Sequence, residues 1–229
     1  MDELTIRPIA RIRSDFLEKF TIPRQSGLVR SLRAEVVFEQ KYRDMSAVRG
    51  LEEFSHLWLI WGFSAVKETR WSPTVRPPRL GGNRRMGVFA TRSPFRPNRL
   101  GLSCLELLEV RQDRLLGPVL TVGGGDLLDG TPIYDIKPYL PYADCRPEAL
   151  GGFASCPQGP ALQVDIPQKL LERVPPEKRE ALLGVLAQDP RPSYQSDPER
   201  IYGAAFGGLE VRFRVSGEVL TVLEVSPKN

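Results

Sequence analysis

Turn-forming residues divide this 229-residue chain into short apolar runs, because it contains 21 prolines and 20 glycines. The runs have the length and alternation typical of β-strands, and no long helical patterns separate them. This arrangement predicts a mainly antiparallel sheet or barrel and disfavours a doubly wound α/β fold. The predicted strands lie at 4–12, 32–38, 56–63, 87–91, 100–110, 115–122 and 131–136, and 46–53 is a candidate helix.

A change of composition after residue 145 divides the chain further. We interpret residues 1–145 as a β-barrel domain, and the proline- and glycine-rich stretch 146–164 as a linker or excursion. Residues 165–229 are interpreted as a small C-terminal α+β domain. The elements predicted in this domain are helices over 167–174 and 176–187 and a hairpin that turns at Ser216-Gly217.

Positive charge is concentrated in one window of the sequence. The chain carries 32 Lys and Arg against 28 Asp and Glu, a net charge of +4. The window 70–105 contains no acidic residue, which leaves two interpretations: a solvated basic loop, or a rigid surface for a polyanion such as nucleic acid. The arginines of this window are Arg70, Arg76, Arg79, Arg84, Arg85, Arg92, Arg96 and Arg99.

The stretch 87–103, GVFATRSPFRPNRLGLS, contains two prolines that fix the backbone between two apolar runs. Side chains on such a turn are presented at a low cost in conformational entropy. Arginine and amide groups can bind phosphate, carboxylate or a purine edge. Arg92, Arg96, Asn98 and Arg99 are therefore candidate ligand-binding residues, and the alternative is a rigid hairpin with solvated arginines.

A second polar stretch, 126–144, combines carboxylates with tyrosines. Its carboxylates could orient an amine or bind ribose hydroxyls, and its tyrosines could stack on a base. Ion pairing with the arginine-rich window is the structural alternative. A metal-dependent phosphoesterase is another hypothesis, which would use the four aspartates. The polar residues are Asp126, Asp129, Asp135, Lys137, Tyr139, Tyr142 and Asp144.

Residue counts argue against several classes of protein. A catalytic triad or a multi-histidine metal site would depend on the single histidine, His56, which we interpret as structural. The three cysteines lack CxxC spacing and predict neither a disulfide framework nor a zinc site. No apolar run is long enough for a transmembrane helix, and we identify no secretory signal. We therefore expect a cytoplasmic protein with no metal and no membrane partner.

Five segments together resemble the TrmO (TsaA-like, YaeB-like) family of tRNA methyltransferases. They are PRQSGLV, RGLEEFSHLWL, RPPRLGG, GVFATRSPFRPNRLGLS and DGTPIYDIKPYLPYAD, and the match runs over about 6–144. A sixth segment, AQDPRPSYQ at 187–195, resembles the longer bacterial members. The resemblance implies a single-sheeted β-barrel, a homodimer, and methylation by S-adenosylmethionine of the exocyclic amine of threonylcarbamoyladenosine beside the anticodon.

The resemblance also implies where the cofactor binds. Two positions depart from the family pattern: Ser64 stands where histidine is frequent, and Arg99 stands where proline is usual. The residues implied to contact S-adenosylmethionine are Pro23, Arg24, Gln25, Phe63, Ser64, Arg92, Leu102, Asp126, Leu127, Asp129, Gly130 and Thr131.

Methyl transfer from a sulfonium requires alignment of the methyl group with the acceptor nitrogen, and it needs no metal or nucleophilic side chain. An acceptor on the exocyclic N–H would help, and Asp129 and Asn98 are our candidates, with Asp126 or a loop carbonyl as alternatives. A non-catalytic RNA-binding β-barrel is the alternative function. The residues expected to bind the tRNA are Arg84, Arg85, Arg96, Asn98, Arg99, Lys137, Tyr142, Arg191 and Tyr194.

Overall fold

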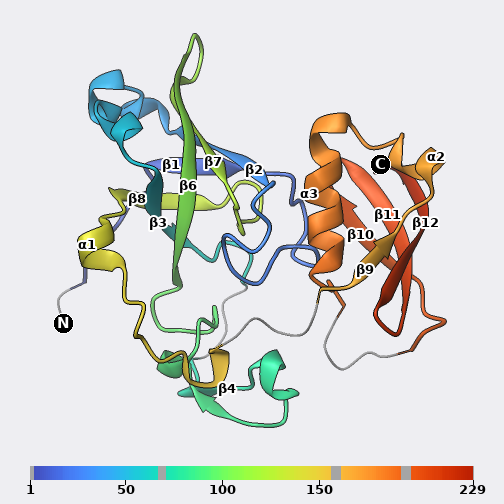
Figure 1. Cartoon of the computed structure of the whole chain (residues 1–229). Coiled ribbons are helices and arrows are strands. Elements are labelled where there is room, and N and C mark those ends of the chain that lie inside the picture. Colours follow the sequence, from blue (N-terminus) through green and yellow to red (C-terminus); the bar gives the residue numbers. More distant parts are fainter. Residues whose placement is uncertain (1–2, 67–70, 156–160, 192–196, 229) are drawn as a thin grey trace.

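The computed structural model describes residues 3–66, 71–155, 161–191 and 197–228 of the chain. Its first part is a closed antiparallel barrel with the strand order β1-β2-β7-β6-β3-β8 (Figure 1). The predicted fold class, mainly β with an antiparallel barrel, is confirmed. The barrel strands are β1 (Ala10–Arg13), β2 (Arg33–Phe38), β3 (His56–Gly62), β6 (Leu100–Asp113), β7 (Gly117–Gly123) and β8 (Pro132–Pro138).

The barrel closes over apolar side chains that alternate along its strands. Leu57 and Leu59 of β3 are fully buried, and Leu105 of β6 lies opposite Leu57 in the antiparallel pair. Ala10 and Ile12 of β1 belong to the same buried cluster. Successive side chains of a strand point to opposite faces, so the apolar runs of the sequence fill one interior and leave the intervening residues outside.

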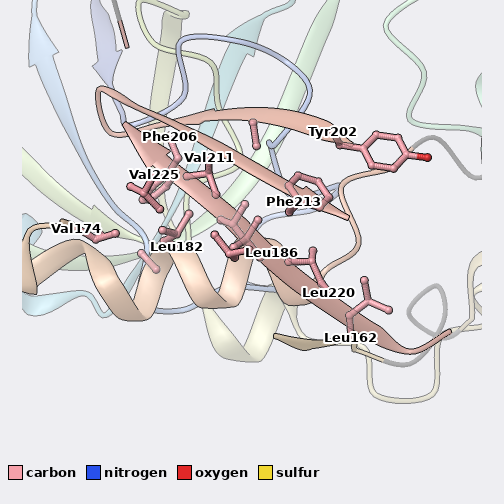
Figure 2. Close-up of a cluster of buried hydrophobic side chains, with 14 of the residues drawn as sticks. Leu162, Val174, Leu182, Leu186, Tyr202, Phe206, Val211, Phe213, Leu220 and Val225 are labelled. Carbon is pink, nitrogen blue, oxygen red and sulfur yellow. The ribbon is translucent and has the colours of Figure 1, made fainter. Parts of the chain in front are cut away.

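The last part of the chain is a four-stranded sheet with helix α3 packed on one face (Figure 1). Strand β9 pairs in parallel with β12, whereas the other pairs are antiparallel. Leu182 and Leu186 of α3 lie in one buried cluster with Phe213 and Val225 of the sheet (Figure 2). The elements are β9 (Gln163–Asp165), α2 (Gln168–Leu171), α3 (Pro176–Ala187), β10 (Tyr202–Phe206), β11 (Leu209–Ser216) and β12 (Val219–Pro227).

The segment between β1 and β2 joins the two parts of the fold. Phe16 and Val29 of this segment belong to the core cluster of the C-terminal domain, and the ring of Phe16 meets Phe206 edge-on at 5.7 Å between centroids. The buried hydroxyl of Thr21 donates to the carbonyl of Ala205 at 2.9 Å. A shared apolar core holds the two parts in a defined geometry, so a site can be built from both.

A two-stranded ribbon of β4 (Thr74–Val75) and β5 (Met86–Gly87) carries much of the arginine-rich window. The predicted strand over 87–91 is wrong beyond Gly87, because the N–H and hydroxyl of Thr91 both donate to the carbonyl of Val88 and form a helical turn. The remaining short elements are η1 (Gln40–Tyr42), η2 (Met45–Val48), η3 (Leu51–Glu53), η4 (Pro78–Leu80), η5 (Val88–Ala90), α1 (Pro141–Asp144) and η6 (Gly152–Ala154).

Four other stretches differ from the sequence-based expectation. The strand predicted over 4–12 begins only at Ala10, and the helix predicted over 167–174 is limited to Gln168–Leu171. The candidate helix over 46–53 is two separate turns, η2 and η3, because Gly50 between them adopts a left-handed conformation with φ of 83°. Strand β9 begins at Gln163, inside the stretch interpreted as a linker, and it pairs with β12 from Val219 to Thr221.

Candidate functional site

A cleft of about 2060 Å³ lies between the arginine-rich window and the C-terminal domain. Its walls come from residues 20–28, from 71–99 in part, from 151–155 and from the end of α3 to residue 191. Apolar side chains such as Phe20 alternate there with arginines. A lining that combines apolar surface with arginines suits a ligand with both apolar and anionic groups.

The turn Pro-Arg-Gln at 23–25 forms one edge of this cleft. The guanidinium Nη1 of Arg92 donates to Gln25 Oε1, which connects two segments that are 67 residues apart in sequence. Behind the turn, the N–H of Gly27 donates to the carbonyl of Gly124 at 2.9 Å. Gly124 has φ of 69° and a Cβ there would lie 3.1 Å from Gly27, so glycine permits the two loops to interlock.

Further arginines of the window line the same cleft and are held by neutral oxygen atoms. A guanidinium has five N–H donors, so a bond to a loop oxygen orients the group without using all of its donors. These bonds explain how the window forms a defined surface. They run from Arg85 Nη1 to Thr74 Oγ1 at 3.0 Å, from Arg96 Nη1 to the Thr91 carbonyl at 3.0 Å and from Arg99 Nη1 to the Val66 carbonyl at 3.4 Å.

The C-terminal domain contributes Arg191 to the cleft. Asp189 holds this guanidinium through both carboxylate oxygens, at 2.8 Å to Nε and 2.9 Å to Nη2. These hydrogen bonds raise the pKa of Arg191. Asp189 adopts φ of 50°, which is uncommon for a residue with a side chain. The sequence indicated Arg191 but not its partner, because the role of Asp189 depends on this local backbone turn.

The carboxylate of Asp126 lies next to the residue that follows the Pro-Arg-Gln turn and accepts hydrogen bonds from Ser26, from Ser103 and from its own backbone N–H. Ser103 Oγ donates to Oδ1 at 2.8 Å, and the backbone N–H of Ser26 donates to the same carboxylate. Burial raises the pKa of Asp126, whereas the hydrogen bonds and the charge of Arg92 act in the opposite direction. A carboxyl group with a perturbed pKa beside a cleft is a candidate functional group.

The raised pKa of Asp126 makes a prediction for the variant Asp126→Asn. The folded wild-type protein holds this proton more tightly than the unfolded chain, whose carboxyl titrates near its ordinary value of 3.8. The protonated Asp126 carboxyl therefore stabilises the fold fully at pH values below 3.8, and this stabilisation is lost as pH rises through the pKa of the folded state. We expect the free energy of unfolding of the wild type to fall relative to that of the variant over this range. Urea unfolding of both proteins at several pH values measures this difference, and a slope of opposite sign would contradict it.

The loop that follows Asp126 is attached to β1. Asp129 Oδ1 accepts from the N–H of Ser14 at 3.0 Å, and the N–H of Gly130 donates to the Ile12 carbonyl at 2.9 Å. Thr131 is buried and its hydroxyl donates to the Leu128 carbonyl, while Leu127 is buried in the barrel core. Among the described residues, none of 126–131 lines the cleft. Asp129 is exposed, so its carboxylate is accessible.

Four more residues that the sequence analysis assigned to the site are Phe63, Ser64, Asn98 and Leu102. The N–H of Phe63 donates to the carbonyl of Arg99 at 3.0 Å, which places the end of β3 beside that arginine. Ser64 follows it and is exposed, and Leu102 is 53% exposed on β6. Asn98 is exposed between two cleft-lining residues. Phe63 and Asn98 thus lie next to Arg99, and none of the four residues belongs to the cleft lining.

The remaining residues expected to bind tRNA are distributed more widely. Arg84 is exposed just before β5, and Lys137 on β8 forms an exposed ion pair with Asp135 at 3.1 Å. Tyr142 is exposed on α1. Tyr194 lies outside the residues that the structure describes. Of the residues expected to bind tRNA, the cleft is therefore lined by Arg85, Arg96, Arg99 and Arg191.

The four aspartates of the phosphoesterase hypothesis have separate partners. Asp126 binds Ser103, Asp129 binds Ser14, Asp135 pairs with Lys137, and Asp144 accepts from Trp58 and from the N–H of Leu140. Within the described parts of the chain, no three His, Cys, Asp or Glu side chains gather as ligands for a metal ion. The same parts contain no helix that is long and apolar enough to cross a membrane.

Two matches to known families cover most of the chain. Residues 11–145 match the family described as tRNA-methyltransferase O N-terminal domain, and residues 160–228 match the TrmO C-terminal domain. The chain belongs to the TrmO family. The resemblance carried by the sequence motifs is therefore confirmed, and it extends to the C-terminal part. TrmO membership makes this protein a tRNA methyltransferase, as the sequence predicted.

Relatives and solved structures agree with this assignment to TrmO. The tRNA (adenine(37)-N6)-methyltransferase of Escherichia coli K12 is 43% identical over 238 residues, which cover the whole of both chains. The protein of the same name from Eikenella corrodens is 50% identical over 71% of this chain and 91% of its own. A crystal structure of TrmO from Pseudomonas aeruginosa superposes with a TM-score of 0.79 and 33% identity, covering 98% of this chain and all of that one.

Proposed function

We propose that this TrmO protein transfers a methyl group from S-adenosylmethionine to the exocyclic amine of threonylcarbamoyladenosine beside the anticodon of tRNA. One observation carries the proposal: the Pro-Arg-Gln turn meets Arg92 at the edge of a large cleft that is lined by further arginines. The relatives from Escherichia coli and Eikenella corrodens are named for adenine 37 and its N6 atom. The threonylcarbamoyl carboxylate would give the arginines a specific anion to bind.

The proposed methyl donor fits the chemistry of the cleft. A relative from Pseudomonas aeruginosa is named a putative S-adenosylmethionine-dependent methyltransferase, and one from Methanothermobacter thermautotrophicus a probable S-adenosyl-L-methionine-binding protein. S-adenosylmethionine supplies an electrophilic methyl group together with a carboxylate, an amine and an adenine ring. Arg24 and Arg92 would bind the carboxylate and Gln25 would hydrogen-bond polar edges at the cleft edge. Phe63 and Leu102, which lie outside the cleft lining, would contact the ring if it extends beyond that edge.

The residues of this chain contribute positioning and proton acceptance. Alignment of the acceptor nitrogen with the methyl group accounts for most of the rate in a reaction of this type. We propose that Asp129 or Asn98 accepts a hydrogen bond from the exocyclic N–H. The Asp129 carboxylate can also take the proton, whereas the Asn98 amide would only orient the N–H and the proton would leave to water. Asp129 is exposed and oriented by Ser14, and Asn98 is exposed beside Arg99, so a substrate can reach either group.

The proposed RNA surface is larger than the cleft. Arg85, Arg96, Arg99 and Arg191 line the cleft, and Arg84, Lys137 and Tyr142 are exposed. We propose that they bind tRNA in the cytoplasm through its phosphates and unstacked bases. A homodimer would also cover the exposed leucines of β6, Leu100, Leu102 and Leu108.

Calorimetry separates this proposal from a non-catalytic RNA-binding barrel. We expect the protein to bind S-adenosylmethionine without tRNA and to bind tRNA with an affinity that falls as salt is raised. An RNA-binding barrel would show the second behaviour without the first. Salt-dependent tRNA binding with no detectable heat from S-adenosylmethionine would therefore favour the alternative.

A further inference from the structure

We infer that Ser103 is a positioning residue for methyl transfer, because it holds the Asp126 carboxylate that fixes the Pro-Arg-Gln turn behind Gln25 and Arg92. Ser103 itself is 2% exposed and does not line the cleft. It was not among the residues that the sequence indicated. The inference rests on the proposed function, since it assigns a role within the same site.

The direction of the Ser103 hydroxyl is set by the barrel. Trp61 of β3 lies opposite Gly101 of β6, and a Cβ at residue 101 would come within 2.4 Å of the indole ring. Because glycine leaves this space, the ring lies across β6 and Trp61 Nε1 donates to Ser103 Oγ at 3.0 Å. The serine oxygen accepts this bond, so its single proton is directed to Asp126 Oδ1 at 2.8 Å.

The Asp126 carboxylate links Ser103 to the residues next to the cleft edge. It accepts the backbone N–H of Ser26, and the next residue, Gly27, donates to Gly124 at 2.9 Å. The two residues that follow the turn, Ser26 and Gly27, are thus both hydrogen-bonded to the loop at 124–126. The side chain of Gln25 accepts from Arg92 at the cleft edge. Hydrogen bonds together with the peptide link between Gln25 and Ser26 therefore connect the indole of β3 to the guanidinium at the cleft.

The charges around Asp126 make this series sensitive to pH. Arg92 on the arginine-rich loop is the charged group that acts on the carboxylate among the described residues, whereas β6, β3 and the turn present a hydroxyl, an indole N–H and a backbone N–H. Hydrogen bonds from Ser103 and Ser26 favour the ionised carboxylate and lower its pKa against the effect of burial. Loss of the Ser103 hydroxyl would therefore raise the pKa of Asp126.

The test is steady-state methyl transfer by Ser103→Ala, measured over a range of pH with S-adenosylmethionine and tRNA carrying threonylcarbamoyladenosine. A hydrogen bond to a charged group is worth about tenfold in an equilibrium constant, so we expect the KM for S-adenosylmethionine to rise about tenfold. We also expect the acidic limb of the kcat/KM profile to move to higher pH. Trp61→Phe removes the indole N–H that donates to Ser103 Oγ. It should raise the KM for S-adenosylmethionine and move the acidic limb to higher pH, in both cases by less than Ser103→Ala.

A matched control separates this role from a structural one. Ser55→Ala removes another hydroxyl hydrogen bond of the barrel, to His56 Nδ1 at 2.9 Å, without touching the series. We expect it to leave the KM and the pH profile unchanged. A folded Ser103→Ala with the wild-type KM and pH profile, or one that loses only thermal stability, overturns the inference. A wild-type protein without methyl transfer would overturn the proposed function as well.

Discussion

Arg92→Ala is expected to lower kcat/KM for methyl transfer about 100-fold, because two or more charge-assisted hydrogen bonds to the ligand are lost. Arg92 is exposed, and its described side-chain bond is to Gln25 across the cleft edge. Removal of an exposed side chain outside the core changes stability by about 0.5 kcal/mol or less. Activity should therefore fall without a matching fall in the unfolding midpoint, as measured by methyl transfer and urea denaturation on the same preparation.

Arg114→Ala provides the matched control for this experiment. Arg114 is also exposed, but it lies in the turn between β6 and β7 and does not line the cleft. We expect the control to retain wild-type kcat/KM, whereas Arg92→Lys should recover part of the activity because it restores charge without the planar fork. If Arg92→Ala unfolds the protein and leaves activity per folded molecule intact, the role of Arg92 is structural.

Phe206→Ala is expected to have the largest effect on stability, about 3–5 kcal/mol. The ring is 1% exposed and belongs to one buried cluster with Leu182 of helix α3 (Figure 2). It also meets the ring of Phe16, from the segment next to β1. Its removal leaves a cavity at the junction of the two parts of the fold. Denaturant unfolding should show a lower midpoint, because the apolar contacts and the close packing are both lost.

Phe89→Ala is the matched comparison, because Phe89 is 72% exposed. The same change of side chain there should alter the free energy of unfolding by about 0.5 kcal/mol or less. Equal effects of the two substitutions would contradict the assignment of the shared core. A stability loss at Phe206 together with weaker tRNA binding would further indicate that the junction maintains the cleft.

The barrel was predictable because its signals are local. Short apolar runs bounded by turn residues predicted strands over 56–63 and 100–110, and the structure has β3 and β6 there. Helix 176–187 was likewise predicted at its observed bounds. Strand β9 is only three residues long and is stabilised by parallel pairing to β12, far along the chain, so its own sequence carries little signal. The turn at 88–90 was missed because Val88 donates to Pro73, a contact that spacing does not reveal.

The sequence predicted several residues of the candidate site but not the hydrogen bonds that join them. The motifs indicated both the Pro-Arg-Gln turn and Arg92, but their hydrogen bond spans 67 residues. Asp126 and Asp129 looked equivalent in sequence, yet one is bound by Ser103 behind the turn and the other by Ser14 of the loop after β1. Ser103 lies within an apolar strand pattern, so nothing in its neighbourhood distinguishes it from a structural serine.

Transfer of labelled methyl from S-adenosylmethionine to tRNA tests the central claim most directly. Two tRNA preparations are compared, one that carries unmethylated threonylcarbamoyladenosine and one that lacks the threonylcarbamoyl group. We predict label in the first and little in the second, with the methyl group on the N6 atom beside the anticodon after nuclease digestion. Absence of label in the tRNA that carries threonylcarbamoyladenosine would contradict the account.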